Sequence, residues 1–360
     1  MHTIKRLTLL VLALSLTAGL GCSHIGPGTI TRDRFDYIGA MSDSWKQQML
    51  YNMVKMRYGD APVFLEVGSV INQYAIETDF NATASWQAPL AGNSNALGVG
   101  AVGRYLDRPT ITYSPLVGEK FARQLIRPIP PTGILSLIES GYPIDMVIRL
   151  CVSSINGVRN RYGGATRGFP SAPEFYPLLE RLRRIQDSGA VSLRTQKNGE
   201  MEGTVMVFRG KVDPAIQEDI LFVRKTLQLD PEGEEFRIVY GAVSKDDKEI
   251  AIQSRSIMQI LIDIASNIEV PPTHLAEKRV SQAMTGDTFQ GAPVPPLVII
   301  HSSPDKPCDA FVAVPFQGHW FWIDDRDMRS KLIFSFMMLL FSLTETGVKD
   351  NAPVITIPVG

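Results

Sequence analysis

The chain has 360 residues, with 36 Lys and Arg, 37 Asp and Glu, and a formal net charge of −1 at pH 7. This balance excludes the strongly basic composition typical of nucleic-acid-binding proteins, so we expect no nucleic-acid partner. With 44% hydrophobic and 20% charged residues, the composition is that of a folded globular protein. No residue pattern indicates a cofactor, and none is predicted.

The first 21 residues have the organisation of an export signal. A basic pair, Lys5-Arg6, precedes the apolar stretch Leu7–Leu16, which is too short to span a bilayer because a spanning helix needs about 20 residues. The segment Gly19-Leu20-Gly21-Cys22 then resembles the lipobox of bacterial lipoproteins, although Gly19 replaces the usual Leu. The resemblance implies that residues 1–21 are removed and that Cys22 carries the lipid. The alternative is an ordinary signal peptide in which Cys22 is incidental.

The residue after Cys22 indicates to which membrane a lipoprotein is delivered. In lipoproteins of this kind, Asp at the second mature position retains the protein in the inner membrane, and here that position is Ser23. The resemblance therefore implies a protein anchored to the outer membrane by its N-terminal lipid and facing the periplasm. A triacylated cysteine would hold it stably, since more than one acyl chain is buried.

The remaining chain predicts an α+β fold in two domains. Residues 22–43 are expected to form a lipidated tether, residues 44–194 an N-terminal α+β domain, and residues 204–360 a C-terminal one. A capping-box pattern, Ser44 to Gln47, predicts the start of a helix that Gly59 can end. This helix carries an apolar face that is expected to be buried: Trp45, Met49, Met53 and Met56.

Alternating segments follow, and they predict an antiparallel meander: Ser69–Thr78, Asp79–Gln87, Ala96–Tyr105 and Thr110–Ser114. The second segment places apolar residues on one face: Phe80, Ala82, Ala84 and Trp86. These residues are mostly small, which favours a half-buried sheet in a soluble domain. The alternative is that residues 69–114 cross the outer membrane as hairpins of an oligomeric channel, as in the curli-secretion lipoprotein family.

The third segment contains a glycine pattern that also occurs in dinucleotide-binding proteins. Gly98–Gly103 satisfies GxGxxG, which binds a dinucleotide only where it joins a strand to a helix. Here another strand is predicted to follow, so we predict no dinucleotide site.

Residues 115–189 are predicted to be mainly helical and rich in arginine: Arg149, Arg159, Arg161, Arg167, Arg181, Arg183 and Arg184. Such arginines either form a solvated, salt-bridged surface or face anionic lipid heads or an acidic partner. Cys151 lies in an apolar helical segment and is expected to be a core residue. A disulfide with Cys308 is allowed in the periplasm, but no sequence feature places the two cysteines close together.

The C-terminal domain is predicted to contain strands and helices in turn. The expected elements are a strand at Thr204–Arg209, a helix capped by Asp213, an antiparallel hairpin of Glu235–Gly241 with Glu249–Ser254, a helix at Ile257–Asn267 and a strand at Leu297–His301. The apolar segment Leu332–Leu343 is too short to cross a membrane and predicts a buried C-terminal helix.

Charged residues stand where the last strand becomes that helix. His319 begins the strand, and three acids end it: Asp324, Asp325 and Asp327. The acids are expected to cap the helix. The alternative is a metal site that joins them to His319 or His301. We find no HExxH motif, nucleophile elbow or Walker loop, so enzymatic activity has no support from a recognised motif.

Three segments resemble uncharacterised proteobacterial lipoproteins: RDRFDYIGAMSDSWKQQMLYNMVKMRYGDAPVFLEVGSVINQY, FRGKVDPAIQEDILFVRKTL and GHWFWIDDRDMRSKLIFSFMMLLFSLTETG. That family has no assigned activity, so the resemblance supplies a class and no site residues. We therefore predict a periplasmic lipoprotein that acts by binding an envelope protein, as an accessory or scaffold. The alternatives are a channel subunit and a periplasmic enzyme or metal-binding protein.

Overall fold

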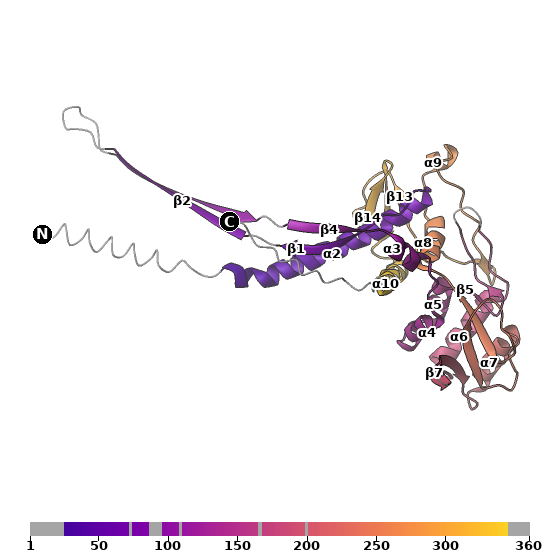
Figure 1. Cartoon of the computed structure of the whole chain (residues 1–360). Helices are drawn as coiled ribbons and strands as arrows, with labels where there is room; N and C mark the ends of the chain where they lie inside the picture. The colour runs from indigo at the N-terminus through magenta and orange to yellow at the C-terminus, as the bar shows by residue number, and fades with distance from the viewer. Residues whose placement is uncertain are drawn as a thin grey trace, which may run out of the picture. The chain divides into compact units, whose positions relative to one another are not determined.

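The computed structural model describes residues 25–71, 74–85, 96–107, 110–164, 168–198 and 201–344 (Figure 1). Cys22 and Ser23 lie outside these residues, so the lipid anchor stays a prediction. Helices combine with largely antiparallel strands in several small sheets, which confirms the α+β class. The chain divides into two compact units. Unit 1 comprises the chain up to residue 44 and residues 65–115, and unit 2 comprises residues 45–64 and 116–360.

The described helices are α2 (Ile25–Arg57), α3 (Glu119–Ile126), α4 (Pro131–Glu139), α5 (Ile144–Cys151), α6 (Phe175–Asp187), α7 (Pro214–Thr226), α8 (Ile257–Ser266), α9 (Pro272–Ala276) and α10 (Met328–Thr344). The described strands are β1 (Phe64–Ile71), β2 (Tyr74–Ser85), β3 (Ala96–Asp107), β4 (Thr110–Leu116), β5 (Val152–Ile155), β6 (Val158–Arg159), β7 (Val191–Asn198), β8 (Met201–Phe208), β9 (Glu235–Tyr240), β10 (Glu249–Ser254), β11 (Thr288–Phe289), β12 (Ala292–Pro293), β13 (His301–Ser303), β14 (Ala310–Phe316) and β15 (His319–Asp324).

Helix α2 is longer than the sequence predicts. It already includes Ile25, so the predicted tether 22–43 is helical where it is described, and a helix start at Ser44 is wrong. A capping-box pattern can also occur inside a helix, because side-chain spacing alone does not show where the backbone turns begin. The predicted apolar face is confirmed, since Met49 and Met53 are fully buried.

Unit 2 contains a six-stranded sheet in the order β6-β5-β10-β9-β8-β7. Its strands β7 and β8 form a hairpin across the predicted domain boundary at residues 195–203, so the chain divides differently from the prediction. A polar hairpin tip has the same composition as a linker, which explains the difference.

The relative direction of two paired strands in this sheet differs from the prediction. Strands β9 and β10 were expected to form an antiparallel hairpin, but they are parallel, with Glu249 beside Arg237. The connecting segment 241–248 runs back along β9, and the Asp247 carbonyl accepts a hydrogen bond from the Asp230 N–H at 2.9 Å. Turn-forming residues predict a local reversal, but they do not determine which strand edge the chain joins next.

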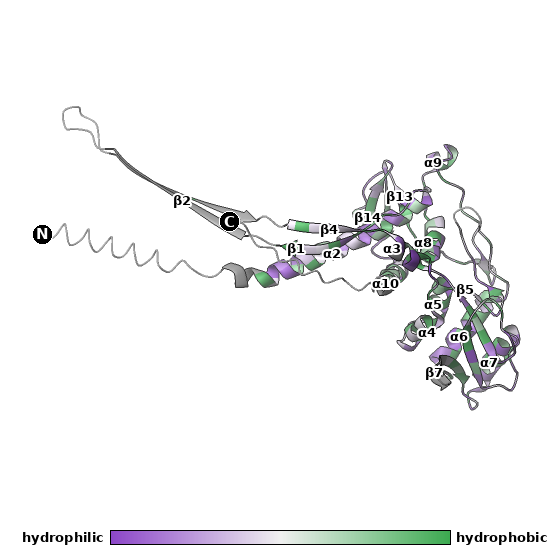
Figure 2. Cartoon of the chain, in the orientation of Figure 1, coloured by the Kyte–Doolittle hydropathy of each residue, from purple (hydrophilic) through white to green (hydrophobic). Residues whose placement is uncertain are grey.

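The helices of unit 2 bury one side each. Helix α6 packs between α5 and α7, and its buried residues include Leu178, Leu182 and Ile185. Figure 2 shows hydrophobic and hydrophilic residues mixed along α6 and α7, as expected for helices with one covered side. Cys151, at the end of α5, is a core residue as predicted, and burial raises the pKa of its thiol to about 12. Cys151 and the exposed Cys308 are both free thiols.

The C-terminal part of unit 2 is a three-stranded sheet, β13-β15-β14, followed by α10. Helix α10 is a buried helix as predicted, and Phe334 and Met337 are fully buried. No described helix is both long and apolar enough to cross a membrane. The predicted strand Leu297–His301 is wrong apart from His301, because the apolar residues before it are buried without joining a sheet.

Candidate functional site

The strands of unit 1 form a ribbon that shares no strand pairing with the six-stranded sheet. Four strands are present, but the predicted break at Thr78 is wrong because β2 runs through it. The predicted meander is also wrong, since the pairing is nested, with β2 beside β3 and β1 beside β4. Alternation within a strand does not show which strands pair. Strands β2 and β3 pair antiparallel over their whole length, from Tyr74 opposite Asp107 to Ser85 opposite Ala96. Among the described residues, these two strands pair only with each other, as the long ribbon in Figure 1 shows.

The register of the ribbon gathers apolar residues on one face. Directly opposite residues occupy the same face of an antiparallel pair. One face therefore holds the apolar pairs Ile76 with Tyr105, Phe80 with Ala101, Ala82 with Val99, and Ala84 with Leu97. The other face holds the pairs Glu77 with Arg104, Asp79 with Val102, Asn81 with Gly100, and Thr83 with Gly98. Thr78 with Gly103 also lies on the first face and Ala75 with Leu106 on the second, so the ribbon has one mostly apolar and one mostly polar face.

Many side chains on the described part of unit 1 are exposed to solvent. Every residue of β4 from Thr110 to Pro115 is exposed. Helix α2 also exposes an apolar stripe before Ser44: Ile30, Phe35, Ile38 and Met41. The side chain of Phe35 is 70% exposed. A two-stranded ribbon is marginally stable alone, and exposed apolar residues are common at interaction surfaces.

The GxGxxG pattern lies wholly within this ribbon. Gly98, Gly100 and Gly103 are all in β3, and the next element is strand β4. The prediction that another strand follows this motif is confirmed.

The predicted metal candidates do not converge. His319 begins β15, and Asp324 ends it. Asp325 Oδ1 lies 2.6 Å from Lys331 Nζ, and Asp327 accepts a 3.0 Å hydrogen bond from the Ser330 N–H at the start of α10. Asp327 thus caps α10 as predicted, but the prediction is wrong for the other two acids. Asp325 pairs with Lys331, and Asp324 accepts a hydrogen bond from the Arg326 N–H before the helix begins. Within the described ranges, no three His, Cys, Asp or Glu residues are grouped closely enough to hold a metal.

His319 instead belongs to an aromatic cluster that the sequence did not indicate. Its ring centroid lies 5.0 Å from that of His274, and His274 Nδ1 is 2.7 Å from the Tyr58 hydroxyl oxygen. Burial lowers the pKa of His274, and nearby Arg279 lowers it further. Phe316 packs against Tyr58 with ring centroids 5.1 Å apart. Tyr58, His274 and His319 come from distant parts of the chain, so residue spacing cannot reveal the cluster.

Most of the predicted arginine run forms salt bridges. Arg183 Nε lies 2.9 Å from Asp187 Oδ2, and Arg184 Nη2 lies 2.6 Å from Asp219 Oδ1. The Asp219 carboxylate raises the pKa of Arg184, and the guanidinium in turn lowers the pKa of Asp219. These pairs match the predicted salt-bridged surface. Arg167 lies outside the described residues.

The ribbon is therefore the candidate functional feature of the described chain, because β2 and β3 pair with no other described strand. Comparison with protein-family models, with curated proteins and with solved structures finds no match to this chain.

Proposed function

We propose that this protein is an outer-membrane lipoprotein whose β2–β3 ribbon pairs with the ribbons of other copies to form an oligomeric channel. One observation carries the proposal. Of the twelve residue pairs in the ribbon, four on one face are apolar and five on the other face contain polar residues, and β2 and β3 pair with no other described strand.

The ribbon has suitable dimensions for this role. Strands of 12 residues are about 40 Å long at roughly 3.4 Å per residue. A membrane-crossing strand needs about 9–11 residues when it is tilted by roughly 45°. In such an assembly the apolar face meets lipid, while the polar face, with Glu77 and Arg104 opposite each other, lines the water-filled interior.

Copies of the same chain are the partners that fit this geometry best. Because β2 and β3 run in opposite directions, placing β3 of one copy beside β2 of the next continues an antiparallel sheet. Repeating that head-to-tail contact by rotation closes a ring in which no strand edge remains unpaired. A different protein would have to supply a complementary ribbon of equal length at both edges.

The lipid anchor is tested first by the mass of the N-terminal peptide. We expect a triacylated peptide that begins at Cys22, found in outer-membrane fractions, because Gly19-Leu20-Gly21-Cys22 resembles a lipobox. Intact-mass spectrometry of protein from fractionated cells measures this. An unmodified peptide in the soluble periplasmic fraction would reject the anchor.

Channel assembly is tested by placing a charge on each face of the ribbon. We expect Phe80→Arg to abolish the detergent-stable oligomer, because Arg or Lys facing lipid at mid-membrane costs about 2–4 kcal/mol per subunit. Asn81→Arg is the matched control, since it introduces the same charge one residue later on the polar face. Light scattering of membrane-extracted protein measures the mass, and planar-bilayer conductance measures the pore.

Each result separates the candidate functions. An oligomer that conducts, survives Asn81→Arg and is lost in Phe80→Arg supports the channel. A wild-type protein that extracts as a monomer and gives no conductance rejects it. In that case a single envelope protein recovered reproducibly by cross-linking in cells would favour the accessory or scaffold function instead.

A further inference from the structure

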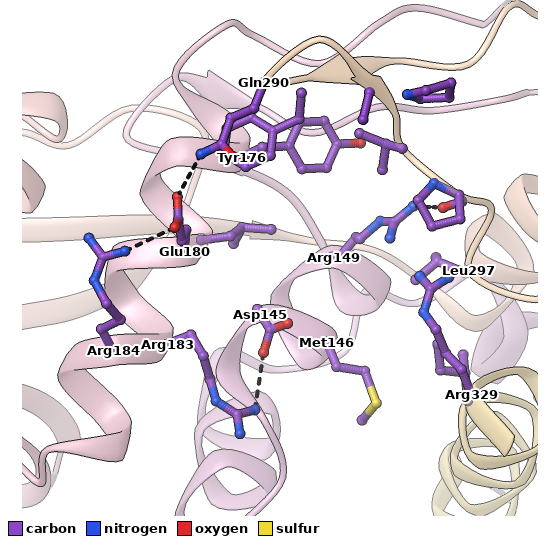
Figure 3. A pocket seen from close by; sticks show the side chains of 17 residues that line it. Asp145, Met146, Arg149, Tyr176, Glu180, Arg183, Arg184, Gln290, Leu297 and Arg329 are labelled. Atoms are coloured by element: carbon purple, nitrogen blue, oxygen red, sulfur yellow. Dashed lines mark hydrogen bonds and ion pairs between the residues drawn. The ribbon is translucent and has the colours of Figure 1, made fainter.

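Unit 2 contains a cavity of about 660 Å³ that the ribbon does not involve. Its walls come from α5, α6, α10 and the segment around β11 and β12 (Figure 3). This volume lies within the range of roughly 300–1,000 Å³ typical of small-molecule sites. The walls are largely apolar: Met146, Leu179, Phe289, Val294, Leu297 and Ile333.

The charges in this cavity are unbalanced. Four arginines line it, together with two carboxylates, Asp145 and Glu180. Both carboxylates already have partners, because Asp145 Oδ1 lies 3.3 Å from Arg183 Nη1 and Glu180 Oε1 lies 3.0 Å from Arg184 Nη1. Figure 3 shows these two ion pairs along one side of the cavity.

The other two arginines, Arg149 and Arg329, have no such carboxylate. Within the described part of the chain, neither makes an ion pair within 4.0 Å. Arg149 donates to the Pro295 carbonyl, and Arg329 Nη1 donates to the Pro296 carbonyl at 3.0 Å. Each guanidinium has five N–H donors, so these bonds leave further donors for a ligand.

The positive charge of Arg329 also acts on Arg149. Burial lowers the pKa of Arg329 itself, although Asp327 and Asp145 oppose this. Arg149 is half-buried on α5, and Arg329 stands at the cavity rim on α10. Burial lowers the pKa of Arg149, and the positive charges of Arg329 and Arg161 lower it further, although Tyr176 and Asp263 oppose this. Neighbouring cations destabilise each other unless an anion lies between them. The guanidinium fork matches the geometry of carboxylate and phosphate groups.

We propose that this cavity binds an anionic amphiphile, with a carboxylate or phosphate head on Arg149 and Arg329 and an apolar body against Met146, Leu297 and Ile333. A charged head alone would leave the apolar walls in contact with water. An uncharged apolar molecule would leave the two guanidinium groups without an anion. Only a ligand with both parts satisfies the whole lining.

The test uses the full chain with Cys22→Ser, so that no covalent lipid competes for the cavity. Titration calorimetry compares octanoate and octyl phosphate with octanol and with inorganic phosphate. We expect at least one of the two amphiphilic anions to bind about tenfold or more tightly than octanol, because each hydrogen bond to a charged group adds to affinity. It should also bind more tightly than inorganic phosphate. Preference between octanoate and octyl phosphate then identifies the head group.

Variants locate the binding. Arg149→Gln and Arg329→Gln should each reduce the affinity for the preferred anion by about tenfold, since each removes one charged donor. Arg181→Gln is the control on α6, because Arg181 lies outside the cavity and stacks on Phe222 at 4.0 Å. Thermal melting confirms that each variant folds, and Arg329→Gln at the rim keeps the test valid if Arg149→Gln does not. Equal binding of octanol, no binding of either anion, or unchanged affinity in the folded variants would overturn the proposal.

Discussion

Asp263→Ala is expected to lower the free energy of unfolding by about 3–5 kcal/mol, because it leaves a buried guanidinium without its counter-ion. Arg255 is the affected cation, and its side chain is only 1% exposed. Its Nη1 lies 3.0 Å from Asp263 Oδ2. The other carboxylate oxygen of Asp263 accepts a 2.5 Å hydrogen bond from the Gly163 N–H, so the same side chain also holds the segment after β6.

Urea denaturation of the purified protein measures this loss. The control is Glu119→Ala, which removes an ion pair with Arg123 on α3, where both side chains are exposed. Exposed pairs contribute about 0–1 kcal/mol, so the control should change stability little. If Asp263→Ala cost no more than Glu119→Ala, the buried pair would not stabilise unit 2 as we infer.

Phe334→Ala is expected to destabilise the protein by about 3–5 kcal/mol through the cavity that it leaves. Phe334 is 0% exposed on α10, and its ring centroid lies 6.1 Å from that of Phe311 on β14. The aromatic ring therefore joins the C-terminal helix to the three-stranded sheet. Loss of this contact should lower the urea midpoint without abolishing secondary structure in circular dichroism.

The matched control for this change lies two residues earlier on the same helix. Leu332 is 60% exposed, so Leu332→Ala removes apolar side-chain atoms with little change in buried volume. We expect a stability change within about 0.5 kcal/mol, as for most surface substitutions. Equal effects of the two substitutions would mean that α10 does not bury Phe334 in solution.

Local patterns predicted many of these elements correctly. The N-cap of α7 is one example, because the Asp213 side chain accepts a 3.0 Å hydrogen bond from the Ala215 N–H, and the sequence Asp-Pro already indicates such a start. The buried face of α2 and the short α10 were predicted from periodicity and length. These features depend on neighbouring residues, so the sequence contains the necessary information.

Pairing between distant strands was harder to predict. The alternation in Asp79–Gln87 indicated a strand, but it did not show that β2 and β3 form a separate ribbon or that their apolar residues share a face. The relative direction of paired strands was also hard to predict, as the parallel pair β9 and β10 shows. Which edges meet depends on the whole topology, which no short segment contains.

The candidate cavity could not be predicted either, because its residues come from distant parts of the chain. Arg149 belongs to the arginine run found in the sequence, but its missing counter-ion became evident only from the contacts around it. Arg329 stands far along the chain, and the sequence gave no reason to join the two. A site assembled from α5 and α10 has no characteristic spacing.

The central position of β10 has a consequence for the order of folding. Ile252 pairs with Ile155 of β5 on one side and with Tyr240 of β9 on the other. The hairpin of β5 and β6 therefore keeps an open edge while nearly a hundred further residues are synthesised. Contacts between such distant residues slow folding, and open strand edges favour aggregation. We therefore expect the six-stranded sheet to form only after residue 254 has been synthesised.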